Sequence, residues 1–177
     1  DFFKINSKVS SDPKEILNSK LAILPGVGAF PEAMNKLKGL NLINAIKEFI
    51  NLEKPFVGIC LGMQLLFENS EEFGNNEGLG IIKGSVKKFD NDTNFKVPHI
   101  GWNKIKKSNN KFDYEIIDFK NFSNIMYFVH SYYVKPESND IIMSYTDYCN
   151  MNFCSSIKHK NIFAFQFHPE KSGLGGL

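Results

Sequence analysis

The stretch PFVGICLGMQLLFE, residues 55–68, decides how this chain folds. Residues 56–59 are mostly apolar and suit a buried strand of a parallel sheet, whereas residues 61–67 have apolar side chains at helical spacing. Between them, Gly58 and Gly62 flank Cys60 in the pattern of a nucleophile elbow. Small flanking residues permit this strained strand-to-helix turn, which lifts a reactive side chain above the sheet.

Two features of the turn favour a reactive thiol at Cys60. The sulfur lies at a helix N-terminus, where the helix dipole is expected to lower the thiol pKa. The amide of Leu61 is expected to point toward a developing oxyanion. The alternative is a buried structural cysteine in an ordinary strand-turn-helix, so the rest of the chain must supply a base.

Outward from this stretch, apolar runs alternate with helical patterns. Strands are expected at residues 2–6 and 21–24, a capped helix begins near residues 11–15, and a helical region from Pro31 is interrupted near Gly39. This order predicts an α/β fold, a doubly wound and mostly parallel sheet with helices on both faces. Beyond residue 69, closely spaced runs predict a β-rich antiparallel extension: 81–89, 95–100, 125–134, 141–145, 153–157 and 162–167.

Composition excludes several functional classes. The 177 residues suit one domain, numbered 1–177, and no linker divides them. A net charge of +2 with dispersed lysines gives no reason to expect a nucleic acid or an anionic membrane as partner. No apolar run reaches the ~20 residues of a spanning helix. Three cysteines in a chain of this length indicate a reducing compartment, hence the cytoplasm.

Neither a metal nor a cofactor is expected. Cys149 and Cys154 have no histidine at ligand spacing, so they are interpreted as structural thiols. Gly26 and Gly28 lack the third glycine of a dinucleotide-binding fingerprint.

His168 is the best candidate for the base. It ends the apolar run 162–167 and precedes Pro169, which favours extended geometry before it, so that His168 and Glu170 can face the same way. The carboxylate would then hold one imidazole nitrogen and leave the other to take the thiol proton. The alternative is a turn that merely closes a strand. His99 and His130, among apolar neighbours, are interpreted as structural residues.

The motifs GICLGMQ (58–64) and QFHPE (166–170) together resemble the class I, triad-type glutamine amidotransferases. The stretches PGVGAF (25–30), PHIGWN (98–103) and YFVHSY (127–132), with Lys171, are similar to one branch, the glutaminase subunits of imidazole glycerol phosphate synthase. The resemblance runs from about residue 5 to residue 173. It implies hydrolysis of the glutamine side-chain amide by a triad of Cys60, His168 and Glu170.

The resemblance also assigns the rest of the site. Matching positions give Leu61, Val27 and Gly28 as the oxyanion hole, with Gln64 and the backbone of Ser131 and Tyr132 holding the amino-acid end of glutamine. In this family the segment with Val27 and Gly28 can need to rearrange before its amide points correctly. Such a rearrangement would make glutaminase activity depend on a partner.

That partner, by resemblance, is a (β/α)8-barrel cyclase in a heterodimer. It would use the channelled ammonia to make imidazole glycerol phosphate and AICAR for histidine biosynthesis. Trp102, the only tryptophan, is expected at the interface, because buried aromatic anchors dominate interfaces. A core position is the alternative for Trp102. Lys171 is expected to join the interface, unless it forms only a local ion pair.

Compared with the family pattern, the sequence lacks a first strand and helix and a last helix. Three other functions stay open at this stage. One is a paralogue that supplies ammonia for surface-sugar modification, and another is a stand-alone cysteine hydrolase of the same fold. The third, a non-catalytic binding subunit, is disfavoured by the intact triad.

Overall fold

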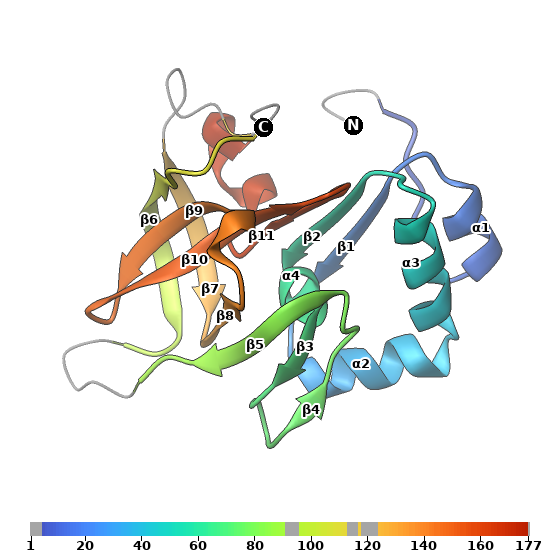
Figure 1. Ribbon diagram of the computed structural model, residues 1–177, viewed down its shortest axis with the longest axis horizontal. Coiled ribbons are helices and arrows are strands. Elements are labelled where there is room, and N and C mark those ends of the chain that lie inside the picture. Colours follow the sequence, from blue (N-terminus) through green and yellow to red (C-terminus); the bar gives the residue numbers. More distant parts are fainter. Residues whose placement is uncertain (1–4, 91–95, 113–116, 118–123, 177) are drawn as a thin grey trace.

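Three parallel strands form the centre of the fold. A computed structural model describes residues 5–90, 96–112, 117 and 124–176 of the chain. Strands β1 (Ala22–Gly26), β2 (Phe56–Cys60) and β11 (Ile162–Phe165) lie side by side in that order (Figure 1). Gly26 is paired with Cys60, and Phe165 with Ile59. The carboxyl ends of strands from the beginning, middle and end of the chain therefore meet at one edge, where α/β sites form.

In the described part of the chain, four α-helices accompany these strands: α1 (Pro13–Asn18), α2 (Phe30–Gly39), α3 (Leu42–Asn51) and α4 (Leu61–Leu65). Helix α1 begins as predicted, because the Asp12 side chain accepts a hydrogen bond from the Lys14 amide at 2.9 Å and proline opens the first turn. The predicted interruption at Gly39 is also confirmed, since α2 ends there and α3 follows as a separate helix.

Helix α4 is shorter than the sequence predicts. The apolar pattern indicated a helix over residues 61–67, but the helix ends at Leu65 and Phe67 opens strand β3 (Phe67–Ser70). Strand β3 pairs in parallel with β5 (Ile82–Lys88), and the Phe67 side chain is fully buried. Sheet pairing at this point outweighs helix propensity, which differs by only tenths of a kcal/mol among such residues.

The second half of the chain forms the predicted antiparallel extension. Its remaining strands are β4 (Asn76–Glu77), β6 (His99–Lys107), β7 (Ile125–His130), β8 (Tyr132–Pro136), β9 (Ile142–Tyr148) and β10 (Met151–His159). Short 3-10 turns are η1 (Asn139–Ile141), η2 (Pro169–Lys171) and η3 (Gly173–Gly176). The main sheet runs β1-β2-β11-β10-β8-β5-β3-β4, and β6 joins β7 to β9. The α/β class with an antiparallel region is confirmed, while parallel pairing among the described strands is confined to β1-β2-β11 and β3-β5.

Three expected strands differ from the structure, and one of them, the run 125–134, is divided into β7 and β8. Of the strand expected at residues 2–6, residues 2–4 lie outside the described part, and Ile5 and Asn6 are not in a strand. Ile5 is 70% exposed, so no apolar surface holds it. Of the strand expected at 95–100, residue 95 lies outside the described part, and the strand begins at His99 and extends to Lys107. Its first position follows Pro98, which cannot donate a backbone hydrogen bond to a sheet.

Two apolar clusters lie on opposite faces of the central strands. Helices α1, α2 and α3 lie on one side of these strands (Figure 1). The first cluster packs them against alternate side chains of the sheet, including Phe56 and Ala164. The second contains Phe163 and Phe165 from the other face, together with Phe128 and Phe153. Within the described residues this second cluster is covered by strands and loops, not by the helices that the alternating pattern led us to expect. The antiparallel extension folds back over that face instead.

Candidate active site

Cys60 lies at the sharp turn between β2 and α4, with φ 54° and ψ −110°. This conformation is strained for a residue with a side chain. Close backbone approach explains both flanking glycines. A methyl group at Gly62 would lie 1.8 Å from the Leu24 carbonyl oxygen, and one at Gly58 would lie 3.0 Å from the Gly62 carbonyl oxygen. The backbone therefore forms the strand-to-helix elbow that the glycine spacing predicts.

The Cys60 thiol is buried and protonated at neutral pH. Its Sγ donates weakly to the Val129 carbonyl oxygen, and Gln166 Nε2 donates to Sγ, both at 3.8 Å. Burial raises the pKa of the thiol to about 11, and the Leu61 amide beside Sγ lowers it by a smaller amount. The expectation of a lowered pKa is therefore wrong, because desolvation outweighs the helix N-terminus. Attack by this thiol requires a base.

The raised pKa predicts slow alkylation of Cys60. A pKa about two units above the usual 9.0 leaves about one hundredth as much thiolate at pH 8. Iodoacetamide should modify Cys60 at pH 8 about a hundred times more slowly in the native protein than in the urea-unfolded protein. Peptide mapping by mass spectrometry measures both rates, and the native rate should climb until pH 11. Equal rates in the two states would contradict the buried, protonated thiol.

His168 and Glu170 follow β11, which is paired in parallel with β2, and the Glu170 charge acts on the Cys60 thiol. His168 Nδ1 lies 2.7 Å from Glu170 Oε1, as the sequence predicts for residues two apart. Nδ1 donates this hydrogen bond, since the carboxylate accepts. The other ring nitrogen, Nε2, is buried and has no hydrogen-bond partner among the described residues. The ring is thus held with one nitrogen occupied and the other bare, which is the arrangement of a general base.

Gln64 and Tyr132 are in contact and are linked to Cys60 through Gln166. Gln64 Nε2 donates to the Tyr132 carbonyl oxygen at 2.9 Å and to Gln166 Oε1 at 3.0 Å. Both amide hydrogens are used within the protein, so only Oε1 remains to meet a ligand. Ser131 precedes Tyr132 at the start of β8, and its carbonyl oxygen accepts from the Phe89 amide at 3.1 Å. The three predicted substrate-binding residues are therefore the consecutive pair Ser131 and Tyr132 and the buried side chain of Gln64, which contacts that pair.

Val27 and Gly28 directly follow β1, whose last residue, Gly26, is paired with Cys60. The Val27 side chain is 78% exposed and Gly28 has φ 95°, a left-handed conformation that favours glycine. This segment is next to the elbow, and its role in an oxyanion hole stays a prediction.

Trp102 lies on the surface, which rules out a core position. Its side chain is 58% exposed and packs edge-on against Tyr127, with ring centroids 5.8 Å apart. Lys171 follows Glu170 in η2, is exposed, and its charge acts on the Cys60 thiol. Within the part of the chain that the structure describes, no salt bridge of Lys171 is found.

Sequence reasoning missed three buried polar side chains near the site. Gln166 contacts both Cys60 and Gln64, although it was recognised only as part of a motif. His99 and His130, interpreted as separate structural residues, contact each other at 3.1 Å. The available signal was their alternation with exposed residues on two neighbouring strands, which puts both rings on the inner face.

Among the described residues, no group of three or more His, Cys, Asp or Glu side chains is arranged to hold a metal ion. No helix in that part is long and apolar enough to cross a membrane.

Known proteins similar to this chain agree on one family. Residues 2–174 match the family described as glutamine amidotransferase class-I. Imidazole glycerol phosphate synthase subunit HisH of Pyrococcus furiosus is 51% identical over 171 residues, covering 96% of this chain and 83% of that protein. The HisH subunit of Aquifex aeolicus is 47% identical over 171 residues, covering 96% and 79%. Imidazole glycerol phosphate synthase hisHF of Arabidopsis thaliana is 47% identical over 167 residues, covering 93% of this chain and 27% of that protein.

Solved structures support the fold. A crystal structure of a glutamine amidotransferase aligns with a TM-score of 0.73 at 11% identity, covering 99% of this chain and 84% of that one. PurLQS from Thermotoga maritima aligns with a TM-score of 0.62 at 18% identity, covering 90% and 74%. The chain belongs to the class I glutamine amidotransferases and, within them, to the HisH subunits of imidazole glycerol phosphate synthase.

Proposed function

We propose that this glutaminase subunit hydrolyses glutamine to glutamate and ammonia through Cys60, His168 and Glu170. The ammonia passes to a (β/α)8-barrel cyclase partner. The single observation that supports the triad best is His168. Its Nδ1 is fixed on Glu170 at 2.7 Å, while the buried Nε2 is bare and has no partner among the described residues. A buried polar atom without a partner is costly unless it has a use, and here the use is to accept the thiol proton.

The reaction then follows in two halves. His168 Nε2 takes the proton of Cys60, and Sγ attacks the side-chain amide carbon of glutamine. The Leu61 amide, already beside the sulfur, donates to the oxyanion, and a donor of this kind contributes roughly 3–4 kcal/mol. His168 returns the proton to the leaving ammonia, and water, activated by the same ring, hydrolyses the γ-glutamyl thioester.

Gln64 supports the choice of substrate. Because its Nε2 donates to Tyr132 and Gln166, the Oε1 atom is the only hydrogen-bonding group left to a ligand. An oxygen acceptor suits the ammonium group of an amino acid. The adjoining backbone of Ser131 and Tyr132 would hold the carboxylate end, so that the site would recognise a free amino acid and not an amide within a peptide.

An exposed apolar face on β6 and β7 supports the proposal that a partner protein binds this chain. Ile100 and Trp102 on β6 share one face with Tyr127 and Ile125 on β7, and all but Tyr127 have side chains at least 48% exposed. A large aromatic residue among apolar neighbours is typical of an interface centre. The Arabidopsis relative, of which this chain covers 27%, has room for a second unit in the same polypeptide. Cys60 and Cys154 are buried thiols outside any disulfide bond, which is compatible with cytoplasmic placement.

Trp102→Ala should weaken binding of the cyclase by about thirtyfold, because truncating an aromatic hot spot costs about 2 kcal/mol. Isothermal titration calorimetry of the full-length chain against a cyclase subunit of imidazole glycerol phosphate synthase measures this change. The control is Leu52→Ala, which shortens an equally exposed side chain at the end of α3. Unchanged affinity of the Trp102 variant would place the interface elsewhere.

The function itself is tested by glutamate release from glutamine, with and without that cyclase subunit. Strong stimulation by the cyclase is expected, together with transfer of ammonia to its nucleotide substrate. Full activity of the chain by itself would favour the stand-alone hydrolase. Absence of glutamate release in both assays would contradict the proposed function.

A further inference from the structure

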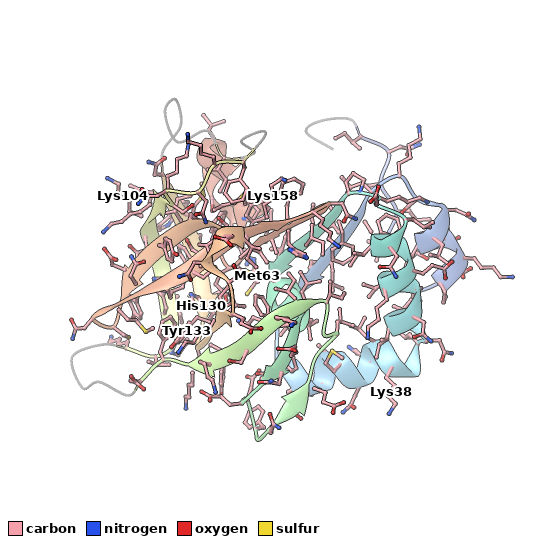
Figure 2. All side chains as sticks on the ribbon, viewed as in Figure 1. Lys38, Met63, Lys104, His130, Tyr133 and Lys158 are labelled. Atoms are coloured by element: carbon pink, nitrogen blue, oxygen red, sulfur yellow. The ribbon has the colours of Figure 1, made fainter. Side chains whose placement is uncertain are left out.

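Two buried histidines outside the triad face each other across strands β6 and β7. His99 and His130 are direct partners in the β6-β7 register, and both side chains point away from the exposed Trp102 face. His99 Nδ1 lies 3.1 Å from His130 Nε2. Figure 2 places His130 where β7 leads into β8. No step of the glutaminase reaction uses either ring.

Their hydrogen-bond partners fix which nitrogens carry protons. His130 Nδ1 lies 2.8 Å from the Tyr132 carbonyl oxygen, which can only accept, so Nδ1 carries the hydrogen. Burial keeps the ring neutral by lowering its pKa to about 3, which leaves Nε2 bare. His99 Nδ1 must then donate to it. Burial also lowers the pKa of His99, to about 4, so His99 Nε2 is an acceptor in turn.

Asn103 supplies the matching donor. Its Nδ2 lies 3.3 Å from His99 Nε2 and also donates to the Asp147 carbonyl oxygen at 3.0 Å. Its Oδ1 accepts from the Lys104 amide at 2.7 Å, which fixes the orientation of the side-chain amide. Every group from Asn103 to Tyr132 therefore donates in the same direction, and no group in the series has a spare proton or a conflicting one.

Aromatic neighbours hold the rings in place. His99 is stacked between Tyr148, with ring centroids 3.9 Å apart, and Phe128, at 4.8 Å. Phe89 packs on His130 at 5.2 Å. Neither imidazole can rotate without disturbing the second apolar cluster, so the hydrogen-bond directions are built into the packing.

The series ends at the candidate active site. The Tyr132 carbonyl oxygen accepts from His130 and also from Gln64 Nε2 at 2.9 Å. Gln64 continues to Gln166, and Gln166 to the Cys60 sulfur. Because the Tyr132 carbonyl oxygen can only accept, Gln64 turns its NH₂ group toward it and presents Oε1 to a ligand.

We propose that Asn103, His99 and His130 are positioning residues, a one-directional hydrogen-bond relay that fixes the Tyr132 backbone and the Gln64 side chain for binding of glutamine. The expected effect of the relay on kinetics rests on the proposed function, whereas the expected positions of its protons do not depend on that function. The relay acts through Tyr132 and Gln64 and touches no reacting atom. It should therefore govern KM for glutamine more than kcat.

The proton pattern is tested by NMR on the chain assembled with its cyclase subunit and labelled with ¹⁵N-histidine. Two-bond ¹⁵N–¹H spectra should show His99 and His130 as neutral rings protonated at Nδ1, from pH 6 to pH 8. Single His→Asn variants assign the signals. A ring protonated at Nε2, or an imidazolium signal at pH 6, would overturn the relay whether or not the protein hydrolyses glutamine.

The kinetic test compares two replacements of His130. His130→Leu removes the donor to Tyr132 and should raise KM for glutamine about tenfold, with kcat within threefold of wild type. His130→Asn places an amide donor near the position of Nδ1 and should return KM to within threefold. Thermal unfolding is measured for both variants. If KM follows the loss of Tm in both, with no rescue by asparagine, the rings have only a structural role and the proposal fails.

A third variant reverses the first donor of the relay. Asn103→Asp presents an acceptor to His99 Nε2 and should move the His99 proton to Nε2, with a rise of about fivefold or more in KM. The matched control is Asn152→Asp, which makes the same change beside Asp147 but outside the relay. Equal effects of the two variants on KM and on the His99 signal would contradict the proposal. Absence of glutaminase activity in the wild type would instead contradict the proposed function. The NMR experiment would still test the relay, because it does not depend on activity.

Discussion

Cys60→Ala should lower glutamate release by at least about 10⁴-fold, even with the cyclase partner bound. The elbow holds a single sulfur, at the end of β2, beside the Leu61 amide. Alanine keeps the backbone turn but removes the nucleophile, and no other cysteine can replace it. Cys154 is buried in β10, and Cys149 lies in the turn before it. Coupled assay of glutamate in the assembled enzyme measures the loss.

The control for this prediction is Cys149→Ala, which removes a half-buried thiol and should leave activity within twofold. Affinity for the cyclase should be unchanged in the Cys60 variant, because the exposed β6-β7 face is intact. Retained turnover by Cys60→Ala would exclude the proposed mechanism. Equal loss in both variants would mean that thiol removal disturbs the fold and not the chemistry.

Gly62→Ala should destabilise the protein by about 3 kcal/mol, because among the glycines that the structure describes an added methyl group comes closest to backbone here. The added carbon would stand 1.8 Å from the Leu24 carbonyl oxygen, and backbone cannot give way as a flexible side chain can. At this chain length, such a loss lowers the midpoint of thermal unfolding by roughly 6–12 °C. Urea and thermal denaturation followed by circular dichroism measure both quantities.

Gly39→Ala is the matched control, because a methyl group there meets nothing within 4 Å and the residue ends helix α2. Alanine should stabilise this position by roughly 0.5–1 kcal/mol, since it restricts the unfolded chain and favours the helix. A Gly62 variant within 1 kcal/mol of wild type would show that β1 and α4 can separate freely. The elbow would then be less tightly packed than its glycine spacing implies.

Local patterns in the sequence predicted the parts of the site that depend on neighbours along the chain. Gly58 is required by its close contact with Gly62 in the same turn, and His168 and Glu170 meet because they are two residues apart. In the same way, the Asp12 cap and the break at Gly39 depend only on local backbone preferences. Each of these features can be inferred from a window of a few residues.

The features that the sequence did not predict depend on contacts between distant segments. Phe67 joins a strand because β5 is there to pair with it. The Cys60 pKa rises because strands from the second half bury the sulfur, whereas the sequence indicates only the helix end beside it. The contact of His99 with His130 requires the register of β6 and β7, which apolar alternation alone does not specify.

The buried, protonated state of Cys60 also bears on oxidative damage. With a thiol pKa of about 11, roughly one molecule in 10⁴ carries a sulfur anion at pH 7. Peroxide attacks the anion and not the thiol, so formation of sulfenic acid at the nucleophile is slowed in proportion. In the resting protein, the protonated state of Cys60 therefore slows oxidation of the catalytic nucleophile.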